Sequence, residues 1–224
     1  MLILAVDTSG KNGSIALVRF GVETAHTLEV VALAGGTFSA QLVPQISELL
    51  KTHNLTKSDI DAFAVASGPG SFTGLRVGLA AVKALSEILE RPIAAVSLLE
   101  AVACAAGIEG EVAAALDAGR GEMYFGKSRV VGSRATMVSQ QLVTVPELLA
   151  CTVDQEIVTP DQKIADLARE NNLRVTQIDP PRADTIARLG FMKIQAGEVI
   201  SAEALDANYI RRSDAETKKS ISHQ

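Results

Sequence analysis

The sequence predicts an α/β fold made of two lobes, each built from one β-β-β-α-β-α unit. Short apolar segments typical of buried strands alternate with segments of helical periodicity, which favours sheets and helices packed in layers. The order strand, hairpin, strand, helix occurs twice, first from residue 1 and again from near residue 111. A period of about 110 residues is too long for a solenoid repeat, so we interpret it as an internal duplication.

Three strands open the first half of the chain. Residues 1–9 are apolar up to Asp7, as expected for a strand covered on both faces. The pair Asn12-Gly13 tolerates the positive φ of a hairpin and leads into a second strand at 14–20, and a third strand fits 27–33. We expect these three strands to form an antiparallel meander within an otherwise mostly parallel sheet.

Helices and further strands alternate through the rest of the first half. A helix from Ser39 to Leu50, with Ser39 as N-cap, carries apolar residues at i, i+4 and i+7. The elements expected after it are a strand at 61–67, a loop at 68–74, a helix at 72–90, a strand at 92–96 and a helix at 98–106.

The second half repeats this order. Its expected strands are 111–117, 123–131, 136–143, 156–158 and 174–178, and its expected helices are 146–151, 161–171 and 183–196. We place the N-terminal lobe at residues 1–104 and a smaller C-terminal lobe at 105–197. The segment 198–224 can pack back on the first lobe, and its polar end from Ser213 is expected to fray.

Composition and charge exclude several classes of function. With 21 Lys and Arg against 26 Asp and Glu, the net charge of −5 has the wrong sign for a protein that wraps nucleic acid unaided. Aromatic residues are only 4% of the chain, too few for a platform that stacks single-stranded nucleic acid. No apolar run approaches the roughly 20 residues that cross a bilayer. We expect no membrane role, and contact with RNA only through a partner.

Cysteine usage and the first residues predict a cytoplasmic protein. Cys104 and Cys151 are too far apart for a C-x-x-C motif. Residues 1–7 lack the basic start and the long apolar stretch of a signal peptide. A reducing compartment is therefore expected.

A glycine-rich loop between a strand and a helix is a candidate anion site. Backbone N–H groups of such a loop can bind an anion at the positive end of the helix dipole. Leu75-Arg76 stands where a Walker A loop has Lys-Ser or Lys-Thr, and Thr73 breaks a G-x-G-x-x-G pattern. The alternative is a tight turn that needs small residues for packing, and both interpretations stay open. The candidate anion-binding residues are Gly68, Gly70, Ser71, Thr73 and Gly74.

Acidic residues end the first strand of each half. Asp7 can hold a hydrated metal or a phosphate, or it can accept hydrogen bonds from the N–H groups of its own turn. Asp117, with Arg120 and Glu122, occupies the corresponding place in the second half, where a charged hairpin base is the favoured interpretation. The sequence alone does not decide whether the acidic residue at either strand end binds a ligand or only stabilises its own turn.

No nucleophile or metal site can be assembled from spacing. His26, His53 and His223 include no i, i+4 pair and have no cysteine nearby. No G-x-S-x-G pattern surrounds Ser71, and Cys104 lies in an Ala-rich helix where inert burial is expected. The sequence therefore predicts no catalytic residues and no metal.

The helix at 72–90 has more apolar surface than one sheet can bury. Its polar residues Arg76, Lys83, Glu87 and Glu90 fall in one stripe of roughly 60°. Leu75, Leu79, Val82 and Leu89 can face the sheet, which leaves a second apolar flank that needs the neighbouring helix, another subunit or both. The residues of that flank are Val77, Ala80, Ala81, Ala84 and Ile88.

Three segments together resemble one protein family: Ile3–Ser9 (ILAVDTS), Ser67–Leu79 (SGPGSFTGLRVGL) and Leu116–Tyr124 (LDAGRGEMY). They are similar to motifs of the bacterial TsaB (YeaZ) family of tRNA threonylcarbamoyladenosine biosynthesis proteins. The second segment is highly specific and the third follows at the expected distance, whereas the region after about Val143 is only generically similar.

The resemblance implies an actin/hexokinase-like (ASKHA) fold of two duplicated lobes and a non-catalytic role. With a catalytic paralogue of the TsaD type and an ATPase of the TsaE type, such a protein helps to convert the tRNA adenosine next to the anticodon into its threonylcarbamoyl form, from threonylcarbamoyl-adenylate. The resemblance implies contact with tRNA only through the complex. It also implies no tightly bound cofactor, and a possible nucleotide at the heterodimer contact.

The resemblance further implies a pairing surface made by two helices of the first lobe. It serves the homodimer when the protein is alone and the heterodimer with the paralogue, and it corresponds here to Ser39–Leu50 and Phe72–Glu90. The residues expected to contact a partner are Leu42, Gln45, Ile46, Phe72, Arg76, Val77, Ala80, Ala81, Lys83, Ala84, Glu87 and Ile88.

The same resemblance argues against a metal. The catalytic paralogue carries a helical His-x-x-x-His pair, and the corresponding segment here runs from Phe38 to Leu42 with no ligand at either end. Two other functions fit the sequence less well. An autonomous actin-like ATPase or small-molecule kinase needs two phosphate loops and an adenosine pocket, for which 224 residues is short, and a metallopeptidase needs ligands that the chain lacks. The ATPase or kinase is kept as the alternative.

Overall fold

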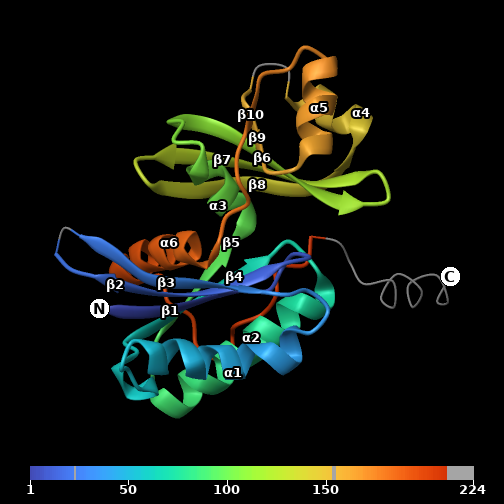
Figure 1. The fold of residues 1–224 in the computed structure, drawn as a ribbon. Coiled ribbons are helices and arrows are strands. Elements are labelled where there is room, and N and C mark those ends of the chain that lie inside the picture. Colours follow the sequence, from blue (N-terminus) through green and yellow to red (C-terminus); the bar gives the residue numbers. More distant parts are fainter. Residues whose placement is uncertain (23, 153–154, 211–224) are drawn as a thin grey trace, which may run out of the picture.

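The computed structural model describes residues 1–22, 24–152 and 155–210. In this part the chain forms two five-stranded mixed sheets, which lie one above the other in Figure 1 with helices between them. The strand order is β3-β2-β1-β4-β5 in the N-terminal sheet and β8-β7-β6-β9-β10 in the C-terminal sheet. Each sheet has three antiparallel strands followed by two parallel ones, which confirms the predicted duplication and the actin/hexokinase-like fold.

The strands and helices lie within two residues of the predicted bounds. The strands are β1 (Leu2–Asp7), β2 (Gly13–Phe20), β3 (Ala25–Leu33), β4 (Ala62–Gly68), β5 (Ile93–Ser97), β6 (Gly110–Gly119), β7 (Glu122–Val131), β8 (Arg134–Thr144), β9 (Ile157–Thr159) and β10 (Val175–Gln177). The helices are α1 (Phe38–Thr52), α2 (Phe72–Leu89), α3 (Leu98–Ala105), α4 (Val145–Cys151), α5 (Gln162–Glu170) and α6 (Ala183–Gln195), with a 3₁₀ turn at Lys57–Asp59.

Helices cover both faces of the N-terminal sheet. Helices α1 and α2 lie on one face and α6 on the other (Figure 1). Every residue of β1 is buried, as predicted for a strand covered on both faces. Its Leu4 and Val6 belong to the core under α1 and α2, whereas Ile3 and Ala5 belong to the core under α6. The alternation of side chains along the strand thus supplies two cores at once.

Two details of the predicted first lobe are wrong. Neither Asn12 nor Gly13 has a positive φ, and Gly13 is the first residue of β2, so the connection after β1 is a loop rather than a tight Asn-Gly hairpin. A Cβ on Gly13 would lie 2.6 Å from the Asp7 carbonyl oxygen and 2.9 Å from the Phe38 ring, so glycine makes room for β1 and α1 instead of making a turn. The N-cap of α1 is Thr37, not Ser39.

Helices α3 and α6 are exchanged between the two lobes. Helix α3 lies before the boundary placed at 104/105, yet it packs on β6, β7 and β8 of the C-terminal sheet. Helix α6 lies after that boundary, yet it packs on β1, β2, β4 and β5 of the N-terminal sheet. A single boundary in the sequence therefore does not separate the two layers, because the last helix of each repeated unit packs on the sheet of the other unit.

The C-terminal segment 198–210 returns to the first lobe. Ile200 pairs with Ile93 at the edge of β5, and Leu205 is fully buried in the core under α1 and α2. The Asn208 N–H donates to the Ser67 carbonyl at 2.7 Å. The remainder of the segment expected to pack here, 211–224, with the frayed end predicted from Ser213, lies outside the described residues.

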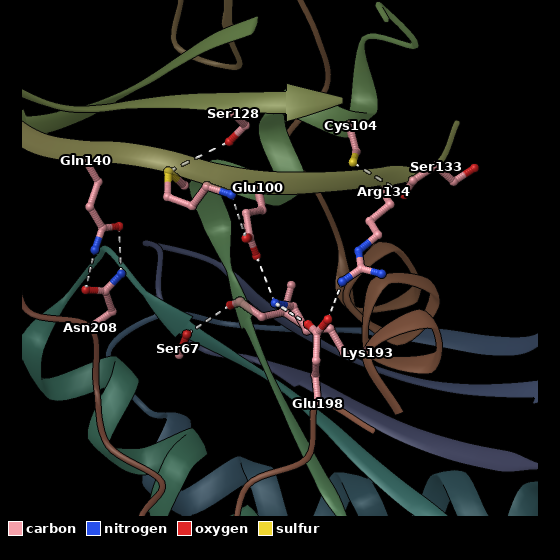
Figure 2. Close-up of polar contacts among 12 residues, drawn as sticks. Ser67, Glu100, Cys104, Ser128, Ser133, Arg134, Gln140, Lys193, Glu198 and Asn208 are labelled. Atoms are coloured by element: carbon pink, nitrogen blue, oxygen red, sulfur yellow. Dashed lines mark hydrogen bonds and ion pairs between the residues drawn. The ribbon is translucent and has the colours of Figure 1, made fainter. Parts of the chain in front are cut away.

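Polar side chains join the lobes beside this segment (Figure 2). Lys193 of α6 forms an ion pair with Glu100 of α3 at 3.2 Å, and Glu198 pairs with Arg134 of β8. The side-chain amides of Gln140 and Asn208 exchange two hydrogen bonds, at 3.0 and 2.9 Å. These contacts set the width of the space between the lobes, because they tie the second sheet to elements packed on the first.

Candidate functional site

A cavity of about 1060 Å³ lies between the lobes and brings the sequence motifs together. Loops of the first lobe, the β6–β7 turn and the C-terminal segment all contribute to it. Asp117, Arg120 and part of the glycine loop lie in its wall, and Asp7 does not. The lining residues are Ser9, Gly10, Lys11, Asn12, Gly35, Gly36, Phe38, Ser39, Pro69, Gly70, Ser71, Phe72, Thr73, Gly74, Val77, Asp117, Ala118, Arg120, Tyr124, Asn208, Tyr209 and Ile210.

The glycines of the loop and of α2 allow the helix to sit directly on the end of β1. A Cβ on Gly70 would lie 2.6 Å from the Ser9 carbonyl oxygen, and one on Gly74 would lie 2.1 Å from the Thr8 carbonyl oxygen. The Thr8 hydroxyl donates to the Gly74 carbonyl at 2.7 Å. The packing interpretation of this loop therefore has direct support in the geometry.

Some polar groups of the glycine-rich loop form hydrogen bonds within the chain. Ser71 is the N-cap of α2, and its Oγ accepts from the Gly74 N–H at 3.3 Å. Its own N–H donates to the Ser9 carbonyl at 2.6 Å. The loop still lines the cavity, through Gly70, Ser71, Thr73 and Gly74. An anion-binding role for these residues and for Gly68 stays a prediction.

Asp7 caps its own turn. Its Oδ1 accepts from the Ser9 N–H at 2.9 Å and from the Ser9 hydroxyl at 2.5 Å. The side chain is buried, and this burial raises the pKa of Asp7 above its usual value of 3.8, while the two hydrogen bonds from Ser9 act in the opposite direction. Of the two interpretations left open by the sequence, the structure shows the local hydrogen bonds.

Replacing Asp7 by Asn is expected to stabilise the protein at neutral pH. A raised pKa means that the folded state holds its proton more tightly than the unfolded state, so the ionised carboxylate costs stability at high pH. An amide oxygen can still accept from Ser9, and it carries no charge to desolvate. The gain in the free energy of unfolding of Asp7→Asn over the parent should shrink as pH falls toward 3.8. Urea unfolding at pH 7 and at pH 4 measures it, and a less stable variant at pH 7 would contradict it.

The second strand end repeats this turn in a more exposed form. Asp117 Oδ1 accepts from the Gly119 N–H at 2.8 Å, just as Asp7 accepts from Ser9. Gly119, Arg120 and Gly121 all have positive φ, which identifies the connection as a tight hairpin that glycine favours. The favoured interpretation of Asp117 as a hairpin base agrees with this geometry.

Phe38, which begins the segment expected to lack metal ligands, belongs to the core. Phe38 is buried and its ring faces Gly13. Within the described residues, no three His, Cys, Asp or Glu side chains come together as a metal site. Burial raises the pKa of the Cys104 thiol to about 11, and the thiol donates to the Ser133 carbonyl (Figure 2). A thiol with so high a pKa is a poor nucleophile.

The proposed pairing surface divides between exposed and buried residues. Leu42 and Ile46 are 1% and 5% exposed, so these two predicted contacts are wrong: they form the core between α1 and the sheet. Val43, 61% exposed on α1, was missed because it lies off the i, i+4, i+7 stripe. Of the predicted contacts on α2, the exposed ones are Phe72, Arg76, Ala80, Ala84, Glu87 and Ile88. Gln45 of α1 and Val77, Ala81 and Lys83 of α2 are half-buried.

The second flank of α2 is thus covered in part by the chain itself. Val77 and Ala81 pack against the core under α1 and α2, as the neighbouring-helix alternative requires. Ile88 is 69% exposed, and Ala80 and Ala84 are exposed beside it.

No helix in the described part of the chain has the length and apolar character to cross a membrane.

Comparisons with known proteins all find proteins of tRNA threonylcarbamoyladenosine formation. A family model described as TsaD, tRNA N6-adenosine threonylcarbamoyltransferase, matches residues 31–202. The chain is 34% identical to the tRNA threonylcarbamoyladenosine biosynthesis protein TsaB of Haemophilus influenzae, over 78% of this chain and 71% of that one. It is 29% identical to the TsaB of Bacillus subtilis over 97% of both chains.

A solved structure extends the likeness to the fold. YeaZ from Pseudomonas aeruginosa superposes with a TM-score of 0.75 at 27% identity, covering 92% of this chain and all of that one. The overall fold, with its two duplicated sheets, therefore agrees with the fold that the sequence motifs predict. The chain belongs to the TsaB (YeaZ) family of tRNA threonylcarbamoyladenosine biosynthesis proteins.

Proposed function

We propose that this chain is a non-catalytic pairing subunit of a TsaD-containing complex that forms threonylcarbamoyladenosine in tRNA. The observation that carries the proposal is the exposed apolar surface of α1 and α2, formed by Val43, Ala80, Ala84 and Ile88. Exposed apolar side chains on two neighbouring helices are typical of a protein contact. A nucleophilic centre, in contrast, needs an activated group, and the pKa of the half-buried Cys104 thiol is raised to about 11.

The partners follow from the same proposal. The surface of α1 and α2 takes a catalytic TsaD-like paralogue, and a second copy of the chain when the protein is alone. A TsaE-like ATPase completes the complex in the cytoplasm, and a nucleotide can lie at the heterodimer contact. Because the net charge is −5, tRNA is bound through the other subunits.

An autonomous actin-like ATPase or kinase is the second candidate, and the cavity favours it. The space of about 1060 Å³ is large enough for a nucleotide, and Lys11 and Arg120 lie in its wall. The glycine loop lies in the same wall, at the N-terminal end of α2. Turnover measurements on the isolated chain separate this candidate from the pairing subunit.

The purified chain alone is expected to show no ATPase, kinase or peptidase activity and only weak binding of tRNA. Its net charge of −5 repels the phosphate backbone. The measurements are steady-state turnover with ATP and filter binding of tRNA at about 150 mM salt. ATP turnover that disappears in Asp7→Ala would replace the pairing subunit with the ATPase, and submicromolar tRNA binding would contradict the proposed route to tRNA.

Reconstitution tests the proposed function itself. A TsaD-like subunit, a TsaE-like ATPase and tRNA are combined with and without this chain, and the modified adenosine is measured by mass spectrometry of digested tRNA. Modification is expected only when the chain is present. Equal modification without the chain would overturn the proposal.

A further inference from the structure

The last described residues of the chain run from the core of one lobe to the core of the other. Leu205 is fully buried in the core under α1 and α2. Ile210, further along the same segment, packs against the core formed by α3 and the C-terminal sheet. We refer to residues 205–210 as the strap. Asn208, Tyr209 and Ile210 also line the cavity, so the strap forms part of its wall.

The first lobe holds the strap through its core and through two hydrogen bonds. Leu205 anchors one end in the core. The Asn208 N–H donates to the carbonyl oxygen of Ser67, near the end of β4, at 2.7 Å. The Tyr209 hydroxyl accepts from Arg76 Nε of α2 at 3.1 Å. These contacts fix the backbone around Asn208, so the Asn208 side chain leaves the first lobe in a defined direction.

Arg76 is itself held in place by an aromatic ring. Its guanidinium carbon lies 3.7 Å from the centre of the Phe72 ring at the start of α2. The centres of the Phe72 and Tyr209 rings are 5.0 Å apart. A guanidinium stacked on an aromatic ring is stabilised by a cation–π interaction. The Tyr209 hydroxyl therefore meets a fixed donor, which keeps the strap against the first lobe.

The polar contact between the strap and the second lobe is easier to break. The side-chain amides of Asn208 and Gln140 of β8 exchange two hydrogen bonds, at 3.0 and 2.9 Å (Figure 2). Gln140 is exposed and Asn208 is half-buried, so water competes for both hydrogen bonds. A neutral pair that water can reach adds little net stability, because each amide finds another partner when the pair breaks.

The lobes are also joined by a junction that is less accessible to water. Lys193 of α6 forms an ion pair with Glu100 of α3 at 3.2 Å, and the two side chains are only 25% and 10% exposed. Glu100 also accepts from the Met137 N–H of β8 at 3.3 Å. Figure 2 shows this junction apart from the pair of Asn208 and Gln140. A rotation of the second lobe about the junction therefore breaks the amide pair first.

We propose that the strap is a reversible clasp for the cavity. In the closed state, which is the present structure, Asn208 holds Gln140. When that pair breaks, the second lobe rotates about the junction of α3 and α6, and the cavity widens. Tyr209 and Arg76 keep the strap on the first lobe, so they set how firmly the clasp closes. The inference goes beyond the proposed function and does not depend on the pairing surface.

A clasp of this kind connects the opening of the cavity to any ligand inside it. A ligand that contacts both lobes across the cavity binds the closed state better than the open one, and so shifts the population toward the closed state. The clasp itself is testable without a ligand, because its two halves can be replaced on the chain alone.

An exchange of charges tests the clasp. Gln140→Asp together with Asn208→Asp places two carboxylates against each other, and is expected to raise the open population about tenfold or more over the parent. Gln140→Lys together with Asn208→Asp puts an ion pair in the same place, and is expected to restore the closed state. Ser139→Asp, which adds a carboxylate to the neighbouring exposed residue of β8, is the control and is expected to stay closed like the parent.

The distance between the lobes is measured by double electron–electron resonance. Spin labels are attached at Lys11→Cys in the first lobe and at Lys163→Cys on α5, both exposed positions, in a chain whose Cys104 and Cys151 are replaced by Ala. Dilution with unlabelled chain ensures that only distances within a single chain are recorded. The parent is expected to give a single narrow distribution, and the variant with two carboxylates a second, shifted one.

A further variant tests the link from α2 to the clasp. Tyr209→Phe keeps the ring and removes the hydroxyl that accepts from Arg76. It is expected to raise the open population about threefold in the parent and to have no further effect in an Arg76→Ala background.

Three results would contradict the proposal. If the variant with two carboxylates gives the same distribution as the parent, the strap is not a clasp. The same follows if the variant with lysine and aspartate is as open as the one with two carboxylates. If Tyr209→Phe leaves the distribution unchanged, the contact with Arg76 has no part in closing the cavity.

Discussion

Replacing Ala84 with Glu is expected to abolish pairing with the paralogue and with a second copy, while the fold survives. Ala84 is exposed in the single chain, so its replacement meets only solvent there. In the proposed complex it lies at the centre of the exposed face of α2, where an unpaired buried charge costs about 3 to 5 kcal/mol. Size-exclusion chromatography and co-purification of the paralogue measure pairing, and circular dichroism measures the fold.

A matched control places the same charge on another exposed apolar residue. Val138 of β8, 63% exposed in the second lobe, serves this purpose, and Val138→Glu is expected to pair like the parent. Ala81 is less suitable than Ala84, because it packs against the chain's own core and a charge there would also disturb the monomer. A folded Ala84→Glu chain that pairs as tightly as Val138→Glu would place the interface elsewhere.

Replacing Gly74 with Ala is expected to cost about 3 kcal/mol of folding stability or more. The added Cβ would lie 2.1 Å from the carbonyl oxygen of Thr8, which is backbone and cannot rotate away. The helix must then move off the end of β1 and lose the hydrogen bond from the Thr8 hydroxyl to the Gly74 carbonyl. Urea unfolding followed by circular dichroism gives the change in free energy.

Gly10→Ala is the control for this prediction. Gly10 lies on the neighbouring loop without a positive φ, and its Cβ would come no closer than 3.1 Å to the Asn12 carbonyl oxygen. A small shift relieves that contact, so a much smaller loss is expected. Equal unfolding midpoints for the two variants would show that the glycine at position 74 is not required by packing.

The order of helices and strands could be predicted because its signals are local. A continuous apolar run indicated β1, and the i, i+4, i+7 pattern indicated α1. The exchange of α3 and α6 between the sheets could not be predicted from the sequence, because it depends on contacts between segments far apart in the chain. Periodicity shows that a helix has a buried face, and says nothing of which layer buries it.

The candidate site was predictable in its parts and not in its assembly. The glycine loop and the two strand ends are motifs that a sequence displays. The loop, Asp117 and Ser9 line one cavity, although Asp7 itself does not. Leu42 and Ile46 look the same in a sequence whether a partner or their own sheet covers them, and here the sheet does. Tyr209 carries no signal at all, because its contact with Arg76 joins residues 133 positions apart.

The level of threonylcarbamoyladenosine in cellular tRNA tests most directly whether the chain acts through its pairing surface. The measurement compares cells that contain only the parent chain, only Ala84→Glu or only Asp7→Asn. The account predicts that Ala84→Glu loses the modification and that Asp7→Asn keeps it, because the first blocks the surface of α2 and the second alters only a buried turn. Normal modification with Ala84→Glu and its loss with a stably folded Asp7→Asn would contradict the account and place the function in the strand ends beside the cavity.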